Sequence, residues 1–142
     1  MATIRDVIKG REIYTCLETQ TVGEICRYMS ERKIGAVVVM RGKELVGIFT
    51  ERDVMSRVVA QGRDAWNTKV GDVMTHNPWV IPPNETVENC LLLMSKHGFR
   101  HLPVCEGDVP VGMISIRDLL IHEVSEKDEE VRQMRAYIHT AR

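Results

Sequence analysis

The sequence predicts an α/β (α+β) fold built from two β-α-β-β-α units followed by a C-terminal helix. Residues 21–55 align without a gap on residues 86–120, and ten of these 35 aligned positions are identical. In both copies the spacing of apolar residues changes from helical to strand-like in the same order. A repeated supersecondary unit therefore fills most of the 142 residues.

Each unit opens with a short β-prone stretch, at 13–15 and 79–81, followed by an amphipathic helix. Thr21 has Glu24 three residues later, which is a capping-box pattern, and Thr86 has Asn89 in a weaker version of it. Apolar residues then recur at i, i+3, i+4 and i+7, so one face of each helix is expected to be buried. These residues are Val22, Ile25, Cys26 and Met29 in the first copy, and Val87, Cys90, Leu91 and Met94 in the second.

Two strands joined by a tight turn come next in each unit, with Gly42 and Gly107 in the turns. The predicted strands are 36–40, 44–49, 102–105 and 109–114. Their apolar and β-branched residues indicate burial on at least one face. A second helix is predicted to begin at Thr50 and at Ser115. Its apolar residues are Val54, Met55, Val58 and Val59 in the first copy and Leu119 and Leu120 in the second.

The segments outside the strands and helices of the units differ in character. Residues 61–69 are polar and are interpreted as a linker, whereas 125–140 read as one more helix. Acids at the start of this tail helix suit the helix dipole, as do the bases near its end, Arg135, His139 and Arg142. Its apolar face could dock on its own domain or on a dimer partner, and the sequence leaves both open. That face consists of Val131, Met134, Tyr137 and Ile138.

The composition argues against some classes of function. Lys and Arg total 19 and Asp and Glu total 20, so the net charge of −1 does not favour nucleic-acid binding. The longest apolar run, 34–40, is too short to span a membrane, and no signal peptide is visible. The four cysteines are scattered without a C-x-x-C pair, which favours reduced thiols, no metal site and a cytoplasmic location.

One motif of the form Gly-h-h-Thr/Ser-x-x-Asp, where h is apolar, occurs in both copies, at 47–53 and 112–118. The second copy also contains Arg-His-Leu-Pro-Val at 100–104, and Asp-Val-Met-Thr stands at 72–75. Together these motifs resemble a pair of CBS domains, the Bateman module, over roughly residues 4–123. The chain is then divided into CBS motif 1 (1–60), a linker (61–69), CBS motif 2 (70–124) and a C-terminal helix (125–142).

The resemblance implies a stand-alone CBS domain-containing protein in which two repeats pack with pseudo-twofold symmetry, leaving two clefts between them. Many members bind adenine nucleotides there, among them AMP, ADP, ATP, NAD-type dinucleotides and S-adenosylmethionine. Such pairs commonly form homodimers. The implied partners are an adenine nucleotide, a second copy and an effector protein whose identity the sequence does not give.

Thr50 with Asp53 and Ser115 with Asp118 are the main candidate binding pairs. Each can be simply a local helix cap, with the Asp at the third helical position. The same geometry also suits a nucleotide, because free N–H groups at a helix start attract phosphate. The Asp carboxylate could then accept hydrogen bonds from both ribose hydroxyls. The two interpretations are compatible.

Four basic residues are the remaining polar candidates. Arg52 and Arg117 precede each Asp, where a cation is slightly unfavourable unless it meets a phosphate. In the resembled family, basic residues at Arg100 and His101 reach phosphates of the ligand held by the other copy's Asp. This implies that the Asp53 cleft takes the more phosphorylated group and that the Asp118 cleft is roomier. The backbone at Thr15 and Ile81 is expected to border the clefts.

The sequence therefore predicts a regulatory module that binds adenine nucleotides between its repeats and transmits occupancy by a conformational change. A ligand-independent interaction or scaffolding module is the main alternative. An enzyme acting on nucleotides is disfavoured, because the chain has no Walker loop and no spare acid cluster for a metal outside the tail. No catalytic cofactor is expected.

Overall fold

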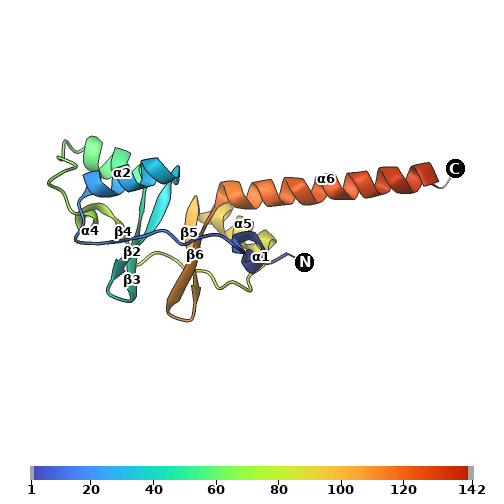
Figure 1. Ribbon diagram of the computed structural model, residues 1–142, viewed down its shortest axis with the longest axis horizontal. Coiled ribbons are helices and arrows are strands. Elements are labelled where there is room, and N and C mark those ends of the chain that lie inside the picture. The colour runs from blue at the N-terminus through green and yellow to red at the C-terminus, as the bar shows by residue number, and fades with distance from the viewer. Residues whose placement is uncertain (1, 141–142) are drawn as a thin grey trace.

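The computed structural model describes residues 2–140 and places the two units side by side, with the last helix extending beyond them (Figure 1). The first part contains α1 (Ile4–Ile8), β1 (Thr15–Leu17), α2 (Val22–Arg32), β2 (Ala36–Arg41), β3 (Glu44–Thr50), α3 (Glu51–Asp53) and η1 (Val54–Val59). The second contains α4 (Val70–Val73), β4 (Thr75–His76), α5 (Val87–His97), β5 (His101–Glu106), β6 (Val109–Ser115) and α6 (Ile116–Thr140). The predicted α/β fold with two repeated units and a C-terminal helix is confirmed.

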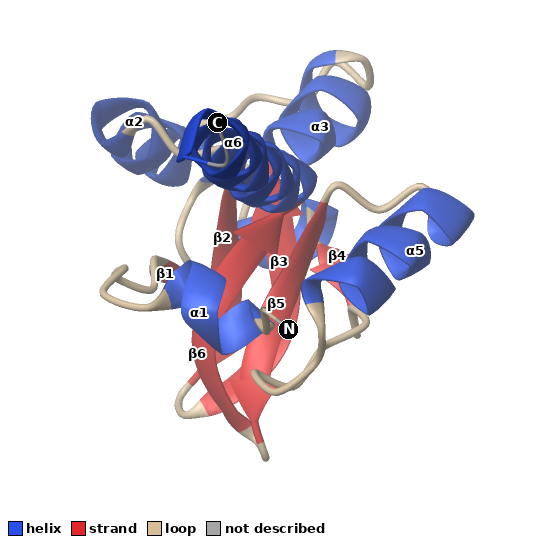
Figure 2. Cartoon of the chain, turned by 90° about the vertical axis from the view of Figure 1, so that its right-hand side faces the viewer, coloured by secondary structure: helices blue, strands red, loops and turns tan. Residues whose placement is uncertain are grey.

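The strands lie in the middle of the molecule with helices around them (Figure 2). One sheet has the order β1-β2-β3-β4, in which only β1 and β2 run parallel, and β5 and β6 form a second, antiparallel sheet. The register shifts between Val39 and Met40 and between Val104 and Cys105, which are equivalent positions in the two copies. Gly42 and Gly107 turn the two hairpins, each with a φ of 61°, a conformation that favours glycine.

The short strand predicted to open each unit is only partly correct. In the first copy it lies at 15–17 instead of 13–15, and in the second only Ile81 bridges Val104, in parallel. Pro82 and Pro83 follow Ile81, and since proline has no N–H, the strand cannot continue through them.

The two units exchange their first helices. Ile4 of α1 is buried with Leu102 and Leu119 in the core of the second unit. Val70 of α4 is buried with Phe49 in the core of the first. The packing therefore crosses the boundary between the sequence ranges 1–60 and 70–124 and ties the two units together.

The glycine that opens each repeated motif makes room for the exchanged segments. A Cβ atom on Gly47 would lie 2.6 Å from the Thr75 carbonyl oxygen and 2.7 Å from the Met74 sulfur. A Cβ on Gly112 would lie 3.2 Å from the Cδ1 atom of Ile8. The backbone after α4 thus passes against Gly47, whereas the atoms nearest to a Cβ on Gly112 belong to a side chain.

The second helix of the first unit departs from the predicted α-helical pattern. After α3 it continues as the wide-turn π-helix η1, in which the Ala60 N–H donates to the Met55 carbonyl at 2.9 Å. Of the apolar residues of this helix, Val58 is buried, whereas Met55 and Val59 are 61% and 70% exposed. In the second unit Leu119 is buried and Leu120 is half exposed.

The C-terminal helix is not a separate element. No glycine or proline interrupts residues 116–140, and α6 runs without a break from the second motif. The apolar residues Val131, Met134, Tyr137 and Ile138 are exposed, so docking of this face on its own domain is wrong for the described chain. The side chain of His139 and residue Arg142 lie outside the described structure. None of the described helices combines the length and the apolar composition needed to cross a bilayer.

The polar segment 61–69, predicted as a linker, packs against the first unit. The Trp66 ring covers Gly23, and the Arg27 guanidinium lies 5.0 Å from its centroid. Thr68 is buried and its hydroxyl donates to the Asp64 carbonyl at 2.7 Å. All four cysteines are free thiols, and burial raises the pKa of Cys16 to about 12.

Candidate functional site

Thr50 and Asp53 form a capping box where β3 ends and α3 begins. The Asp53 N–H donates to the Thr50 hydroxyl at 3.2 Å, and the Thr50 N–H donates to Asp53 Oδ2 at 3.0 Å. Asp53 is 6% exposed. The capping interpretation of this pair is confirmed, and it fixes the direction of the carboxylate.

Ser115 and Asp118 repeat this geometry at the start of α6. The Asp118 N–H donates to the Ser115 hydroxyl at 3.0 Å, and the Ser115 N–H donates to Asp118 Oδ2 at 3.1 Å. The Asp118 side chain is more open, at 26% exposure against 9% for Asp53. Both copies therefore present an aspartate whose Oδ2 accepts a hydrogen bond from the backbone N–H of the residue three positions earlier.

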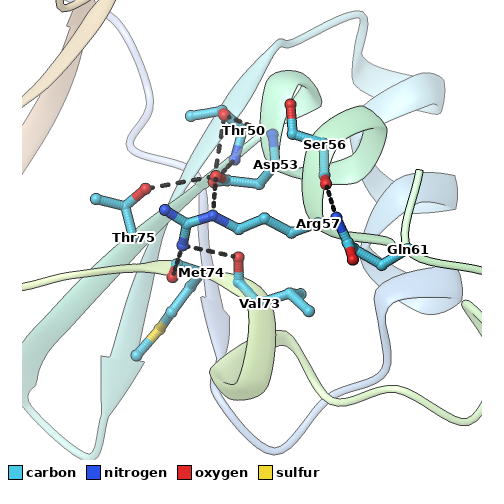
Figure 3. A network of polar contacts seen from close by, with 8 residues as sticks. All are labelled: Thr50, Asp53, Ser56, Arg57, Gln61, Val73, Met74 and Thr75. Carbon is cyan, nitrogen blue, oxygen red and sulfur yellow. Dashed lines mark hydrogen bonds and ion pairs between the residues drawn. The ribbon is translucent and has the colours of Figure 1, made fainter. Parts of the chain in front are cut away.

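The second oxygen of Asp53 belongs to a network that joins the helix to the exchanged segment (Figure 3). Thr75 donates its hydroxyl to Oδ1 at 3.4 Å, and the Arg57 Nε lies 3.7 Å from the same atom. Arg57 also donates to the Met74 carbonyl at 2.7 Å. A ligand that took over Asp53 Oδ1 would disturb contacts reaching from η1 to β4.

The second oxygen of Asp118 is bound by Arg11, whose guanidinium lies 3.0 Å from Oδ1. Arg11 stands just after α1, the helix that packs on the second unit. Burial raises the pKa of the Asp118 carboxyl, but the Ser115 hydrogen bonds and the Arg11 cation outweigh it and hold that pKa below its usual range. Asp118 is therefore a carboxylate with an arginine counter-ion.

His101 lies between the two copies. It pairs with Ser115 across β5 and β6, while its ring reaches the first unit. A Cβ on Gly35 would lie 3.6 Å from His101 Nε2 and 3.1 Å from Glu51 Oε1. Burial lowers the pKa of His101, although the nearby Glu51 and Asp118 carboxylates act in the opposite direction. A partly buried, neutral imidazole thus stands close to the start of α3.

The other predicted site residues take no part in the contacts around Asp53 and Asp118. Arg52, Arg100 and Arg117 are exposed, and none of their guanidinium groups forms a hydrogen bond or ion pair with another described residue. Thr15 is exposed at the start of β1. The Ile81 N–H donates to the Pro103 carbonyl at 3.1 Å, and its carbonyl accepts from the Cys105 N–H at 2.9 Å, so its N–H is already used within the sheet.

Four residues near the motifs were not predicted from the sequence: Arg11, Glu51, Arg57 and Thr75. Arg57 follows Asp53 by four residues, a spacing that brings side chains together on a helix, so this signal was present. Thr75 belongs to the quoted Asp-Val-Met-Thr stretch. Nothing in the sequence links Arg11 to Asp118. A depression of about 430 Å³ opens beside the Asp53 network and is lined by Ser56, Arg57, Gln61, Arg63, Asp72 and Val73.

Comparison with known proteins places these motifs in a family. The CBS domain family model matches residues 3–60 and 70–125. The chain is 35% identical over 147 residues to the mitochondrial CBS domain-containing protein CBSX3 of Arabidopsis thaliana, covering 96% of this chain and 71% of that protein. It is 31% identical to the CBS domain-containing protein YhcV of Bacillus subtilis, covering 88% of each.

Solved structures agree with the sequence matches. A protein with CBS domains from Burkholderia ambifaria superposes with a TM-score of 0.83 at 36% identity, covering 87% of this chain and 95% of that one. A CBS-domain-containing protein from Agrobacterium tumefaciens gives a TM-score of 0.79 at 34% identity, covering 86% and 99%. The two capped aspartates thus lie in a tandem repeat of known type, and the chain belongs to the CBS-domain family, a family of regulatory modules.

Proposed function

We propose that this protein is a regulatory module that binds adenine nucleotides beside Asp53 and Asp118 and transmits their presence by a conformational change. One observation carries the proposal. Both copies hold an aspartate at a helix start with Oδ2 capped and Oδ1 bound by a side chain from a distant or neighbouring turn. The two ribose hydroxyls of a nucleoside are suitable donors for such a carboxylate.

The contacts of Oδ1 suggest how occupancy would be transmitted. A ribose at Asp118 competes with Arg11, which follows α1, and a ribose at Asp53 competes with Arg57 and Thr75 around β4. Binding therefore favours a state in which these side chains have moved. A ligand shifts the balance between two states only through such differential contacts.

The two sites are proposed to differ in their preference for phosphate. Arg100 is exposed and forms no ion pair with any residue that the structure describes, and His101 reaches Gly35 and Glu51 of the first unit. Both fit a phosphate of a ligand held by Asp53. The negative charge of Glu51 repels a highly charged phosphate group at the Asp53 site. The equivalent residue at the Asp118 site is Ile116, which carries no charge. We expect Arg100→Ala to weaken binding of ATP at the Asp53 site more than binding of adenosine.

The test is a thermal-shift and calorimetry panel on nucleotide-stripped protein with AMP, ADP, ATP, NAD and S-adenosylmethionine. A ligand at about 100 times its dissociation constant adds roughly 2.7 kcal/mol to the free energy of unfolding. The shift should shrink in Asp53→Asn or Asp118→Asn, and Asp108→Asn, an exposed turn residue, is the control. No shift with any of these ligands contradicts the proposal.

Binding of a phosphorylated ligand should become tighter as the pH is lowered from about 8 to about 6. The pKa of His101 is lowered in the free protein, so its ring is neutral over most of this range. A phosphate nearby favours the protonated ring, and binding then takes up a proton. Lowering the pH supplies that proton, so the affinity rises. In the protein without ligand, lowering the pH has the opposite effect on stability. Below about pH 6.5 the unfolded chain protonates His101 more readily than the folded protein does, so the free energy of unfolding falls as the pH falls.

Isothermal titration at several pH values, in buffers of different ionisation enthalpy, measures this proton uptake directly. His101→Gln should bind with little dependence on pH over the same range. An equally steep dependence in His101→Gln would show that another group takes up the proton.

A second candidate function is a protein-interaction module, as favoured by the exposed apolar residues of α6. The two functions are compatible, because a homodimer or an effector protein bound to α6 could respond to nucleotide in the clefts. Nucleotide turnover is not part of either proposal. Incubation with ATP or NAD followed by analysis of products would reveal an enzyme instead.

A further inference from the structure

Helix α6 extends well beyond the body of the protein (Figure 1). Its 25 residues span about 37 Å, and the elements that it contacts include α1, α5 and β6. Leu119 is fully buried in the second core. The five apolar side chains that follow along one side are 46% to 65% exposed, namely Leu120, Val124, Val131, Met134 and Ile138. A helix with such a face is normally covered by another element.

The spacing of these side chains is that of a coiled coil. Val124, Val131 and Ile138 recur every seven residues, and Leu120 and Met134 belong to a second series of the same period. The two series correspond to the a and d positions of a heptad repeat. Lys127 occupies the remaining d position between Leu120 and Met134. The face thus fits a second helix packed along its length.

The charges of α6 select the direction of that second helix. Residues 123–130 contain five acids and one base, whereas 131–138 contain two bases and no acid. Two copies side by side in the same direction would bring the acidic halves together and Lys127 against Lys127. In opposite directions each acidic half meets a basic half.

We infer that α6 pairs with α6 of a second copy in an antiparallel coiled coil. The register that fits both the apolar and the charged positions places Val131 against the partner's Met134 and Lys127 beside the partner's Ile138. Asp128 then faces the partner's Arg135, and the twofold symmetry repeats this ion pair. In this register the tip of each helix lies near residue 125 of the other.

The inference does not depend on nucleotide binding, and charge reversal tests it. Asp128→Arg and Arg135→Asp are each expected to weaken self-association of the full chain about tenfold at low salt, because both symmetry-related pairs become repulsive. The double variant restores the attraction and should associate like the wild type. Glu129→Arg makes the same change of charge on the opposite side of the helix and is the matched control.

Sedimentation equilibrium over a range of protein concentrations measures these constants. If another surface also joins two copies, loss of the α6 contact still removes one association step. Equal association constants for the wild type and both single variants would overturn the inference, as would a double variant that associates no better than the single ones.

Cysteine cross-linking tests the direction of the helices. In an antiparallel pair a mixture of Lys127→Cys and Ile138→Cys chains forms a disulfide between different variants. Lys127→Cys alone does not, because its two copies lie about 16 Å apart along the axis. The parent chain, with its own four cysteines, is the control. Efficient cross-linking of Lys127→Cys with itself would show a parallel pair and overturn the proposed arrangement.

Discussion

Replacing Gly47 by Ala should destabilise the protein by about 3 kcal/mol, whereas the same change at the equivalent Gly112 should have an effect below about 1 kcal/mol. At Gly47 the new methyl group would lie 2.6 Å from the Thr75 carbonyl oxygen, so β4 would have to move away from β3. At Gly112 it would lie 3.2 Å from the end of the Ile8 side chain, which can rotate. Neither glycine has a positive φ, so alanine is not strained by its backbone conformation.

Urea denaturation of the two variants beside the wild type measures this difference. Alanine also restricts the unfolded chain and thereby stabilises by about 0.4–1 kcal/mol, which offsets the small overlap at Gly112 but not the large one at Gly47. Gly112→Ala is therefore the matched control. An equal decrease in the free energy of unfolding at both positions would contradict this explanation. It would mean that the glycine is required for a reason common to both copies and not by the close approach of the Thr75 carbonyl to Gly47.

The expected difference gives a physical reason for the glycine of the repeated motif. In both copies the residue lies where the segment exchanged from the other half of the chain crosses the second strand of the hairpin. Alignment of the two copies identifies the glycine but cannot show what lies against it. The neighbours of Gly47 and Gly112 come from α4–β4 and from α1 respectively, outside the aligned ranges 21–55 and 86–120.

The elements that were predicted well depend on local signals. The helices α2 and α5 begin directly after Thr21 and Thr86, whose hydroxyls cap them, and the hairpins turn at Gly42 and Gly107 as expected. The elements that were missed depend on tertiary contacts. The wide turns of η1, the exchange of α1 and α4, and the single bridge at Ile81 have no periodicity from which they could be inferred.

The same division applies to the site. Thr50 with Asp53 and Ser115 with Asp118 are pairs three residues apart, so their mutual hydrogen bonds follow from the helix start. Arg11 lies 107 positions before Asp118 and reaches it only because α1 packs on the second unit. His101 reaches Gly35 for a similar reason. The sequence thus predicted the two capped aspartates of the candidate site but not the side chains that bind their Oδ1 atoms.

Substitutions of Asp53 can distinguish its contribution to stability from its proposed contribution to nucleotide binding. Asp53→Ala should lower the free energy of unfolding by about 3 kcal/mol, because it removes the carboxylate that accepts from the partly buried Thr50 N–H and the Thr75 hydroxyl and that faces Arg57. Asp53→Asn keeps an oxygen that can accept from the Thr50 N–H, so we expect a loss of only about 1 kcal/mol. Denaturation of both variants measures the two losses.

The asparagine variant then tests the proposed ribose contact in a protein that remains folded. An amide has one acceptor oxygen, and if that oxygen stays on the Thr50 N–H, the group facing the ligand becomes an NH₂ donor. Two ribose hydroxyls donating to the carboxylate would lose their acceptor, and the affinity for an adenine nucleotide at this site should fall at least about tenfold, or 1.4 kcal/mol. Wild-type affinity in Asp53→Asn, with the expected small loss of stability, would mean that Asp53 serves only to cap α3 and to hold Arg57 and Thr75. The nucleotide site would then have to be sought elsewhere on the protein.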